Sequence, residues 1–244
     1  MRPLLVALAF CVPAAASAAP LTLTVRVRRG SKVYAHSEKA AAGQQTNYVG
    51  EIGERKVIVN ANASTVSGGY MVQYQAEVSD PDEHATFQVQ QSLFVRAGEP
   101  TRAVECGGWV VEVGVDAPTG AKAAPWTAAS GNTRLTTTAG KRKCVLASAP
   151  DTQTNVIDTV RRKGFILNAV ARQAGPSFKL EYQLESSPAV DSGEISLPLG
   201  VKTPSKGRKA QFLLEGRALP TATPAQGAAA PEKNQGDGAV PMLR

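Results

Sequence analysis

The sequence repeats one short pattern, a strict alternation of apolar and polar side chains. In residues 21–28 every second residue is Leu or Val, and Thr or Arg occupies the positions between them. The same period of two returns in four further segments, at residues 57–61, 70–78, 87–95 and 111–115. Because successive side chains of a β-strand point to opposite faces, this period indicates strands with one buried face.

Residues that form tight turns separate these segments. They are Ser-Gly-Gly at 67–69, Asp-Pro-Asp at 80–82, Ala-Gly-Glu-Pro at 97–100 and Gly-Gly at 107–108. Short strands at this spacing predict an all-β fold, either a sandwich or a barrel. We expect two related antiparallel β-modules with sandwich-like packing. The segment 152–162 fits a short helix and a strand equally well.

The chain also contains an internal repeat. With a shift of 108 residues and no gap, eight of the 22 positions from 58 to 79 are identical to their counterparts. The identical pairs include Asn60 with Asn168 and Gln75 with Gln183. Convergent patterning of unrelated hairpins is the alternative, but these polar matches favour duplication. With a two-residue adjustment, the match extends to about residue 96.

The repeat and the local composition together predict how the chain is divided. The stretch between the copies is rich in Ala, Thr, Gly and Pro, and the last residues contain four prolines with few large apolar side chains. Within the connector we expect a strand or two, near 134–138 and 143–147. The expected segments are a signal peptide (1–18), a first β-module (19–116), an Ala/Thr/Gly-rich connector (117–150), a second β-module (151–216, repeating about 57–96) and a disordered tail (217–244).

The first 18 residues have the features of an export signal. Met1-Arg2 supplies a positive start, and the apolar run at 4–12 is far shorter than the roughly 20 residues that span a bilayer. Ala16 and Ala18 have the spacing that signal peptidase recognises. Cleavage after about Ala18 removes Arg2 and lowers the formal net charge from +7 to +6. We expect a periplasmic or secreted protein. A lipoprotein acylated at Cys11 is the alternative, which the bulky residue before it disfavours.

Two cysteines remain after this cleavage, Cys106 and Cys144. In an oxidising compartment a lone pair most simply forms one disulfide. The bridge closes a loop of about 39 residues, worth roughly 3–4 kcal/mol in the chain-entropy account. The alternative is two reduced, buried thiols. These cysteines and two distant histidines are too few ligands for a zinc site, and we expect neither a metal nor a cofactor.

No recognisable catalytic motif is present. Gly-x-Ser-x-Gly, Ser-x-x-Lys and His-Glu-x-x-His are all absent from the sequence. The densest polar cluster, residues 80–84, is first a turn; a cation site is the alternative, without the spacing of a calcium loop. We therefore expect a protein that is not an enzyme and has no small-molecule substrate. An unrecognised hydrolase, using Asp82, Glu83 or His84, is a rival hypothesis.

Two groups of side chains are candidates for contact with a partner. An aromatic group occupies equivalent repeat positions; core packing is the favoured role and an exposed strip is the alternative. A basic group would bind an anionic polymer, a lipid or a membrane surface. Aromatic residues make up 5% of the chain, too few for stacking on bases, so nucleic acid is not an expected partner. The aromatic group is Tyr70, Tyr74, Phe178 and Tyr182; the basic group is Arg26, Arg28, Lys206, Arg208 and Lys209.

Residues 33–115 contain a series of short motifs: His36-Ser37, Gly43-Gln44, Tyr48-Val49-Gly50-Glu51, the segment 91–100, and Gly107-Gly108. With these motifs the segment resembles the β-domain of secretins, the outer-membrane channel proteins of bacterial secretion and pilus systems. The resemblance implies a β-module of the cell envelope that stacks or pairs with others; it does not imply a channel. We expect an assembly or interaction module whose partner is an envelope protein or a second copy, joined by strand pairing.

Overall fold

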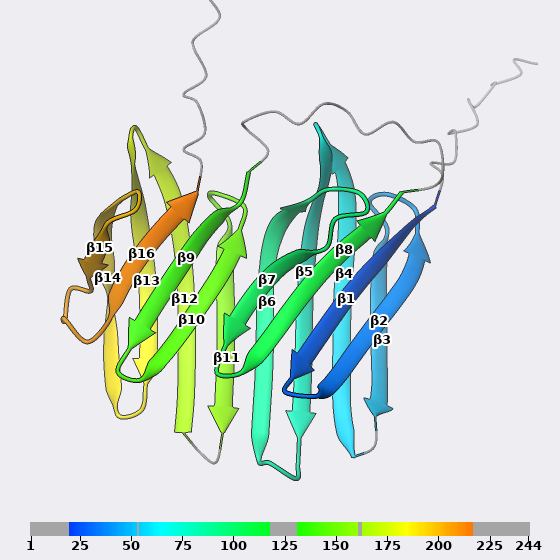
Figure 1. Cartoon of the computed structure of the whole chain (residues 1–244), viewed down its shortest axis with the longest axis horizontal. Coiled ribbons are helices and arrows are strands. Elements are labelled where there is room, and N and C mark those ends of the chain that lie inside the picture. The colour runs from blue at the N-terminus through cyan, green and yellow to red at the C-terminus, as the bar shows by residue number, and fades with distance from the viewer. Residues whose placement is uncertain (1–19, 53, 118–130, 161–162, 217–244) are drawn as a thin grey trace, which may run out of the picture.

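The computed structural model describes residues 20–52, 54–117, 131–160 and 163–216, which form sixteen strands in two sheets (Figure 1). Every pairing between two named strands is antiparallel. The predicted all-β class and sandwich-like packing are confirmed. The predicted signal peptide (1–18) and tail (217–244) lie outside the described residues.

The first eight strands form one structural unit, which we call the first unit. Two hairpins, β1–β2 and β7–β8, belong to sheet A, and the four-stranded meander between them belongs to sheet B. The bounds are β1 (Leu21–Arg29), β2 (Lys32–Ala40), β3 (Gln45–Ile52), β4 (Arg55–Val66), β5 (Gly69–Asp80), β6 (Ala85–Val95), β7 (Thr101–Cys106) and β8 (Trp109–Asp116).

The last eight strands repeat this plan as the second unit. Hairpins β9–β10 and β15–β16 lie in sheet A, and the meander β11–β14 lies in sheet B. The bounds are β9 (Thr133–Ala139), β10 (Arg142–Ser148), β11 (Gln153–Val160), β12 (Lys163–Ala174), β13 (Ser177–Ser186), β14 (Ala189–Pro198), β15 (Lys202–Pro204) and β16 (Gln211–Gly216).

The two units lie side by side in the same orientation. Sheet A has the order β2-β1-β8-β7-β10-β9-β16-β15, and sheet B has the order β3-β4-β5-β6-β11-β12-β13-β14. The repeating unit therefore begins at β9, inside the segment 117–150 for which a connector is expected. The two strands in this segment, β9 and β10, are part of sheet A, because β10 pairs with β7 of the first unit and β9 pairs with β16 of the second. The ambiguous segment 152–162 contains strand β11.

Strand registers show how far the sequence repeat extends. Asn60 lies opposite Gln75 in the first unit, and their counterparts Asn168 and Gln183 lie opposite each other in the second. The shift of 108 residues that relates the two sequences therefore also relates the strand registers of the β4–β5 and β12–β13 hairpins.

The extension of the repeat beyond residue 80 needs a different shift. Ser186 is the counterpart of Val78. Ser186 pairs with Ala189 across a turn of two residues, whereas Val78 pairs with Phe87, and eight residues lie between them. The second hairpin is therefore shorter by six residues, and the two-residue adjustment aligns β6 wrongly with β14.

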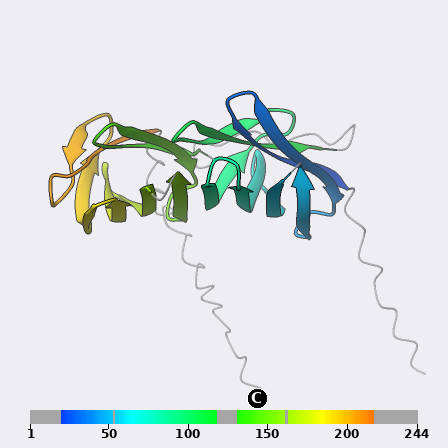
Figure 2. The ribbon, with the colours of Figure 1, turned by 90° about the horizontal axis from the view of Figure 1, so that it is seen from below.

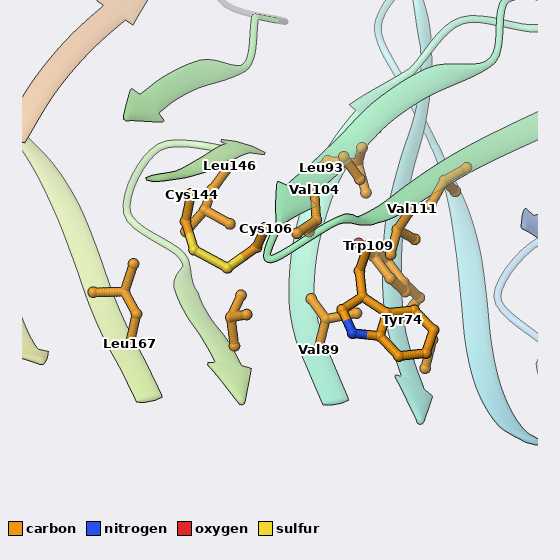
Figure 3. Packing of buried hydrophobic residues seen from close by; sticks show 14 of the residues in the cluster. Tyr74, Val89, Leu93, Val104, Cys106, Trp109, Val111, Cys144, Leu146 and Leu167 are labelled. Carbon is orange, nitrogen blue, oxygen red and sulfur yellow. A yellow bond between two sulfur atoms is a disulfide. The ribbon is translucent and has the colours of Figure 1, made fainter. Parts of the chain in front are cut away.

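The alternating apolar side chains fill the space between the sheets. Figure 2 shows these sheets as two layers, and Figure 3 shows the close packing of the core around the disulfide. Trp109, Phe87 and Phe165 are wholly enclosed, and the first two stack with ring centroids 5.0 Å apart. Burial of each large apolar side chain stabilises the fold by roughly 1.5–3 kcal/mol.

Candidate interaction surfaces

The aromatic side chains proposed for contact lie mainly inside the sandwich. Tyr74, Phe178 and Tyr182 are buried, and Tyr70 packs partly against the core. A ring enclosed between two sheets cannot touch a partner, so the burial supports the packing role and not the exposed strip. The phenol oxygens of the two buried tyrosines have internal partners: Tyr74 accepts a hydrogen bond from Gln91 Nε2 at 2.9 Å, and Tyr182 donates one to Asp191 Oδ1 at 3.1 Å.

The basic residues do not form one patch. Arg26 and Arg28 lie on β1, while Arg208 and Lys209 lie in the β15–β16 turn, five strands away in sheet A. At the usual spacing of neighbouring strands this separation is roughly 24 Å. Arg26 is also paired with Glu112 at 3.6 Å. These residues therefore do not together form a focused basic site for an anionic polymer or lipid.

The acidic turn at 80–84 is matched by basic side chains. The carboxylate of Asp80 accepts a hydrogen bond from Arg55 Nε at 2.6 Å and lies 3.4 Å from Lys32 Nζ. Glu83 pairs with Arg29 at 2.6 Å and with Lys32 at 2.9 Å. The turn thus ties together the β1–β2, β3–β4 and β5–β6 hairpins. Within the described ranges, no group of three or more His, Cys, Asp or Glu side chains is placed to hold a metal ion.

The same contacts set the protonation of Asp80. Burial alone raises the pKa of its carboxyl, but hydrogen bonds from Arg55, from the Glu83 N–H and from Lys32 outweigh burial and leave the pKa below its ordinary value. The hydrogen bond from Lys32 and the charge of Arg29 lower the pKa of Glu83. These carboxylates are ionised and paired, which is a structural arrangement and not that of a general acid.

The two units meet along a line that we call the seam. In sheet B, β6 and β11 pair over six positions; in sheet A, β7 and β10 pair over three. Cys106 lies opposite Cys144 in the shorter pairing, and the predicted disulfide joins them. The bridge therefore reinforces the half of the seam that has fewer paired positions. A disulfide is compatible with a periplasmic or secreted location.

Polar side chains add further links across the seam. The Gln91 side-chain amide, on β6, donates hydrogen bonds to Tyr74 Oη at 2.9 Å and to the Ala147 carbonyl of the second unit at 3.2 Å. Asn132 exchanges two hydrogen bonds of 2.8 Å with the backbone of Phe94. Together with the disulfide, these links hold the two units in one sandwich.

A buried carboxylate and a glycine turn also meet at the seam. Asp158 of β11 has no solvent exposure, and its carboxylate lies 3.2 Å from Arg142 Nη1. Burial raises the pKa of this carboxyl, although the charges of Arg142 and Arg29 act in the opposite direction. Gly107 has a φ of 59°, and a Cβ there would overlap the Asp158 carboxylate. Glycine is therefore required by both conformation and space.

The ends of the sandwich are open, because no strand pairs with the outer side of β2, β3, β14 or β15 in the described residues. β3 and β14 are long edges of eight and ten residues. The β15 edge has only three residues and ends in Pro204, which lacks a backbone N–H. Sheet B is thus the sheet with long, unpaired edges at both ends.

The large apolar side chains that the described part exposes most gather at these ends. Val33 is on β2, Val49 on β3, Val190 on β14, and Val201 just before β15, with exposed fractions from 50% to 66%. The sequence did not predict this exposure. The alternation of side chains along a strand is the same whether the strand lies inside the sheet or at its edge, so it does not show whether an outward-facing valine is covered by a neighbouring strand.

A second feature missed from the sequence is a row of amides on the outer face of sheet B. Its eight members lie opposite one another from strand to strand across the whole sheet. Beside them, in the first unit and at the seam, is a hollow of about 500 Å³ lined mainly by Gln and Asn side chains. The amide row consists of Ser192 on β14 and of seven amide residues, which are Asn47, Asn60, Gln75, Gln90, Asn155, Asn168 and Gln183.

The amide row has unused hydrogen-bonding capacity. The Oδ1 atoms of Asn155 and Asn168 are enclosed and accept no hydrogen bond. The sequence signal that could have revealed the row is the recurrence of Asn or Gln on the polar phase of successive strands.

Comparisons with known protein families, with curated proteins and with solved structures yield no match. In the part of the chain that the structure describes, no helix is long and apolar enough to cross a membrane.

Proposed function

We propose that this chain is an exported, non-catalytic assembly module of the cell envelope, and that it binds partner proteins by strand addition at the open edges of sheet B. The observation that carries the proposal is the position of the exposed apolar side chains. Val49 and Val190 lie on the two long edge strands, at opposite ends of the sheet. Apolar surface and unpaired backbone groups at the same place are what strand addition requires.

The edges lack two of the devices by which sheets avoid such pairing, although β14 carries the buried, inward-pointing Asp191. Lysine, proline and bulges commonly protect an edge. β3 contains neither lysine nor proline, and β14 has proline only at its last position. The secretin resemblance of residues 33–115 and the predicted signal peptide are consistent with an envelope module that pairs with others.

Site-specific photo-crosslinking in cells tests this proposal. A photoreactive amino acid at position 49 or 190 should give discrete adducts, because each position lies at an edge that a partner would cover. The matched control is position 73, since Gln73 is exposed on the same face of sheet B but on β5, an interior strand that is paired on both sides. Adducts at 73 equal to those at both edge positions, or no adducts at 49 and 190, would contradict edge binding.

The amide row supports a second candidate function, the binding of an uncharged glycan chain. Amides can donate to and accept from hydroxyl groups, and the hollow of about 500 Å³ at the row is lined mainly by Gln and Asn side chains. Soluble chito- and cello-oligosaccharides are suitable probes in titration calorimetry. Binding that is lost in Asn155→Leu and retained in the edge variant Val49→Lys would support this function, and the absence of binding would remove it.

A further inference from the structure

We infer that the partner at the open edges is a second copy of this chain, bound head to tail, with β14 of one copy paired with β3 of the next. This inference rests on the proposed function and names its partner. It follows from the internal repeat, because the seam already shows how one unit of this fold joins another.

The two ends of sheet B are equivalent to the two sides of the seam. β3 and β11 begin their respective meanders, and β6 and β14 end them. The edge that β6 presents to β11 is therefore the edge that β14 leaves open, and the edge of β11 that receives β6 corresponds to the open edge of β3. The ends are complementary and not identical, so they can join in a repeating, head-to-tail manner.

The register of the seam predicts the register of the new contact. At the seam, Gln88 lies opposite Ile157. The position equivalent to Gln88 is Val190, because these residues lie opposite Glu77 and its counterpart Glu185. The position equivalent to Ile157 is Val49, because both residues lie opposite the equivalent isoleucines of β12 and β4. Val190 of one copy thus lies opposite Val49 of the next, and each valine becomes half-buried, as Gln88 and Ile157 are at the seam.

The neighbouring positions are compatible with this pairing. By the same transfer, Ser192 lies opposite Asn47 of the next copy, which continues the amide row from one molecule into the next. Glu194 lies opposite Gln45, so no two like charges meet directly. The Lys209 ammonium donates to the Val190 carbonyl at 3.1 Å, an exposed contact that can give way when a strand is added.

Two differences from the seam make the contact between copies reversible. The position equivalent to Cys106 is Ser205, and the position equivalent to Cys144 is Tyr34, so no disulfide can form there. At the β3 end, the stacked rings of His36 and Tyr48 occupy the places of Leu146 and Val156 in the seam. These rings cover the end of the core in a single copy.

Sedimentation velocity of the full oxidised chain, with the variants Val49→Lys and Val190→Lys, tests the inference. The wild type should form a concentration-dependent series of oligomers. Each variant alone should lose this series and stop at the monomer, because each lacks one of the two edges. An equimolar mixture should form a one-to-one dimer and nothing larger, because the intact β14 edge of Val49→Lys fits the intact β3 edge of Val190→Lys.

A control variant and three possible outcomes decide whether the head-to-tail arrangement holds. Gln73→Lys adds the same charge to an interior strand of the sheet and should assemble like the wild type. Dimers of Val190→Lys alone, or of Val49→Lys alone, would indicate symmetric pairing and overturn the head-to-tail arrangement. A wild type that stays monomeric at all soluble concentrations also overturns it. In that case crosslinks to other proteins at 49 and 190 would leave the proposed function standing, and their absence would remove both.

Discussion

Cys106 of β7 lies directly opposite Cys144 of β10, and the bond between them crosses the seam between two structural repeats. Both cysteines are buried, and Figure 3 shows the bridge among the packed core residues. Its position means that the disulfide does not simply close a loop. It fixes the second unit beside the first at the place where sheet A has three paired positions.

Replacement of both cysteines by serine should therefore loosen the seam as well as lower stability. We expect the free energy of unfolding to fall by about 4 kcal/mol, the size of the loop-closure term for this separation. Urea unfolding measures the fall, and hydrogen exchange should show the largest increase in β7 and β10. Wild type in a reductant is the control and should behave like the variant. Equal protection of β7 and β10 with and without the bridge would contradict its role at the seam.

Gln91→Leu tests the polar link across the seam. The substitution keeps a side chain of similar length but removes the donor to Tyr74 and to the Ala147 carbonyl. We expect a loss of about 1–3 kcal/mol in the free energy of unfolding, because buried acceptors lose their partner. Tyr74→Phe, which removes the hydroxyl and leaves the contact to Ala147, should cost less. A smaller effect for Gln91→Leu than for Tyr74→Phe would contradict this account.

Asp80→Asn should lower the free energy of unfolding at neutral pH and make that free energy less dependent on pH in the acidic range. The pKa of Asp80 is lower in the folded chain than its ordinary value of 3.8, so its ionised form stabilises the fold above that pH. This contribution disappears as the pH falls through the lowered pKa. We expect a loss of about 1–3 kcal/mol at pH 7 from the broken hydrogen bonds. The loss should shrink towards pH 2.

The measurement is urea unfolding of wild type and Asp80→Asn from pH 7 to pH 2. Asp82→Asn serves as the control, since Asp82 pairs with the same Arg55 but is half exposed. A control that loses as much stability as Asp80→Asn would show that burial of Asp80 is not the cause.

Asp158→Asn should have the opposite pH signature. The pKa of Asp158 is raised by burial, so the folded state binds a proton more readily than the unfolded state does. Its contribution is favourable at low pH and declines as the pH rises from 3.8 through the raised pKa. The variant should lack this decline and be at least as stable as wild type at pH 7. Thermal unfolding across this range measures it, with exposed Asp116→Asn as the control. A variant markedly weaker than wild type at pH 7 would indicate that the Arg142 pair dominates.

Much of this architecture is encoded in local sequence. The alternation in residues 21–28 predicts β1, because a period of two is a property of the extended backbone itself. The matches of Asn60 with Asn168 and of Gln75 with Gln183 predict the repeated hairpin, and the strand registers agree. The pairing of Cys106 with Cys144 follows from the number of cysteines that remain when Cys11 is removed with the predicted signal peptide. Each of these inferences needs only a local pattern, a comparison of two segments of the sequence, or a count of residues.

The candidate surfaces depended instead on which strands become neighbours. Val49 and Ile157 hold equivalent places in the repeat, yet one is exposed at an edge and the other lies at the seam. No local pattern distinguishes them, because exposure on a sheet is set by the next strand and not by the strand itself. The amide row likewise exists only when eight strands align in register.

By itself, then, the sequence determined the strands, the duplication and the disulfide partners, since these follow from side-chain period, identity and number. The tertiary structure decided that the duplicated units join side by side, that the aromatic residues face inward, and that valines remain at both open ends. These outcomes depend on pairing between segments far apart in the chain. The free energy of such pairing is shared between two strands, and neither strand encodes it alone.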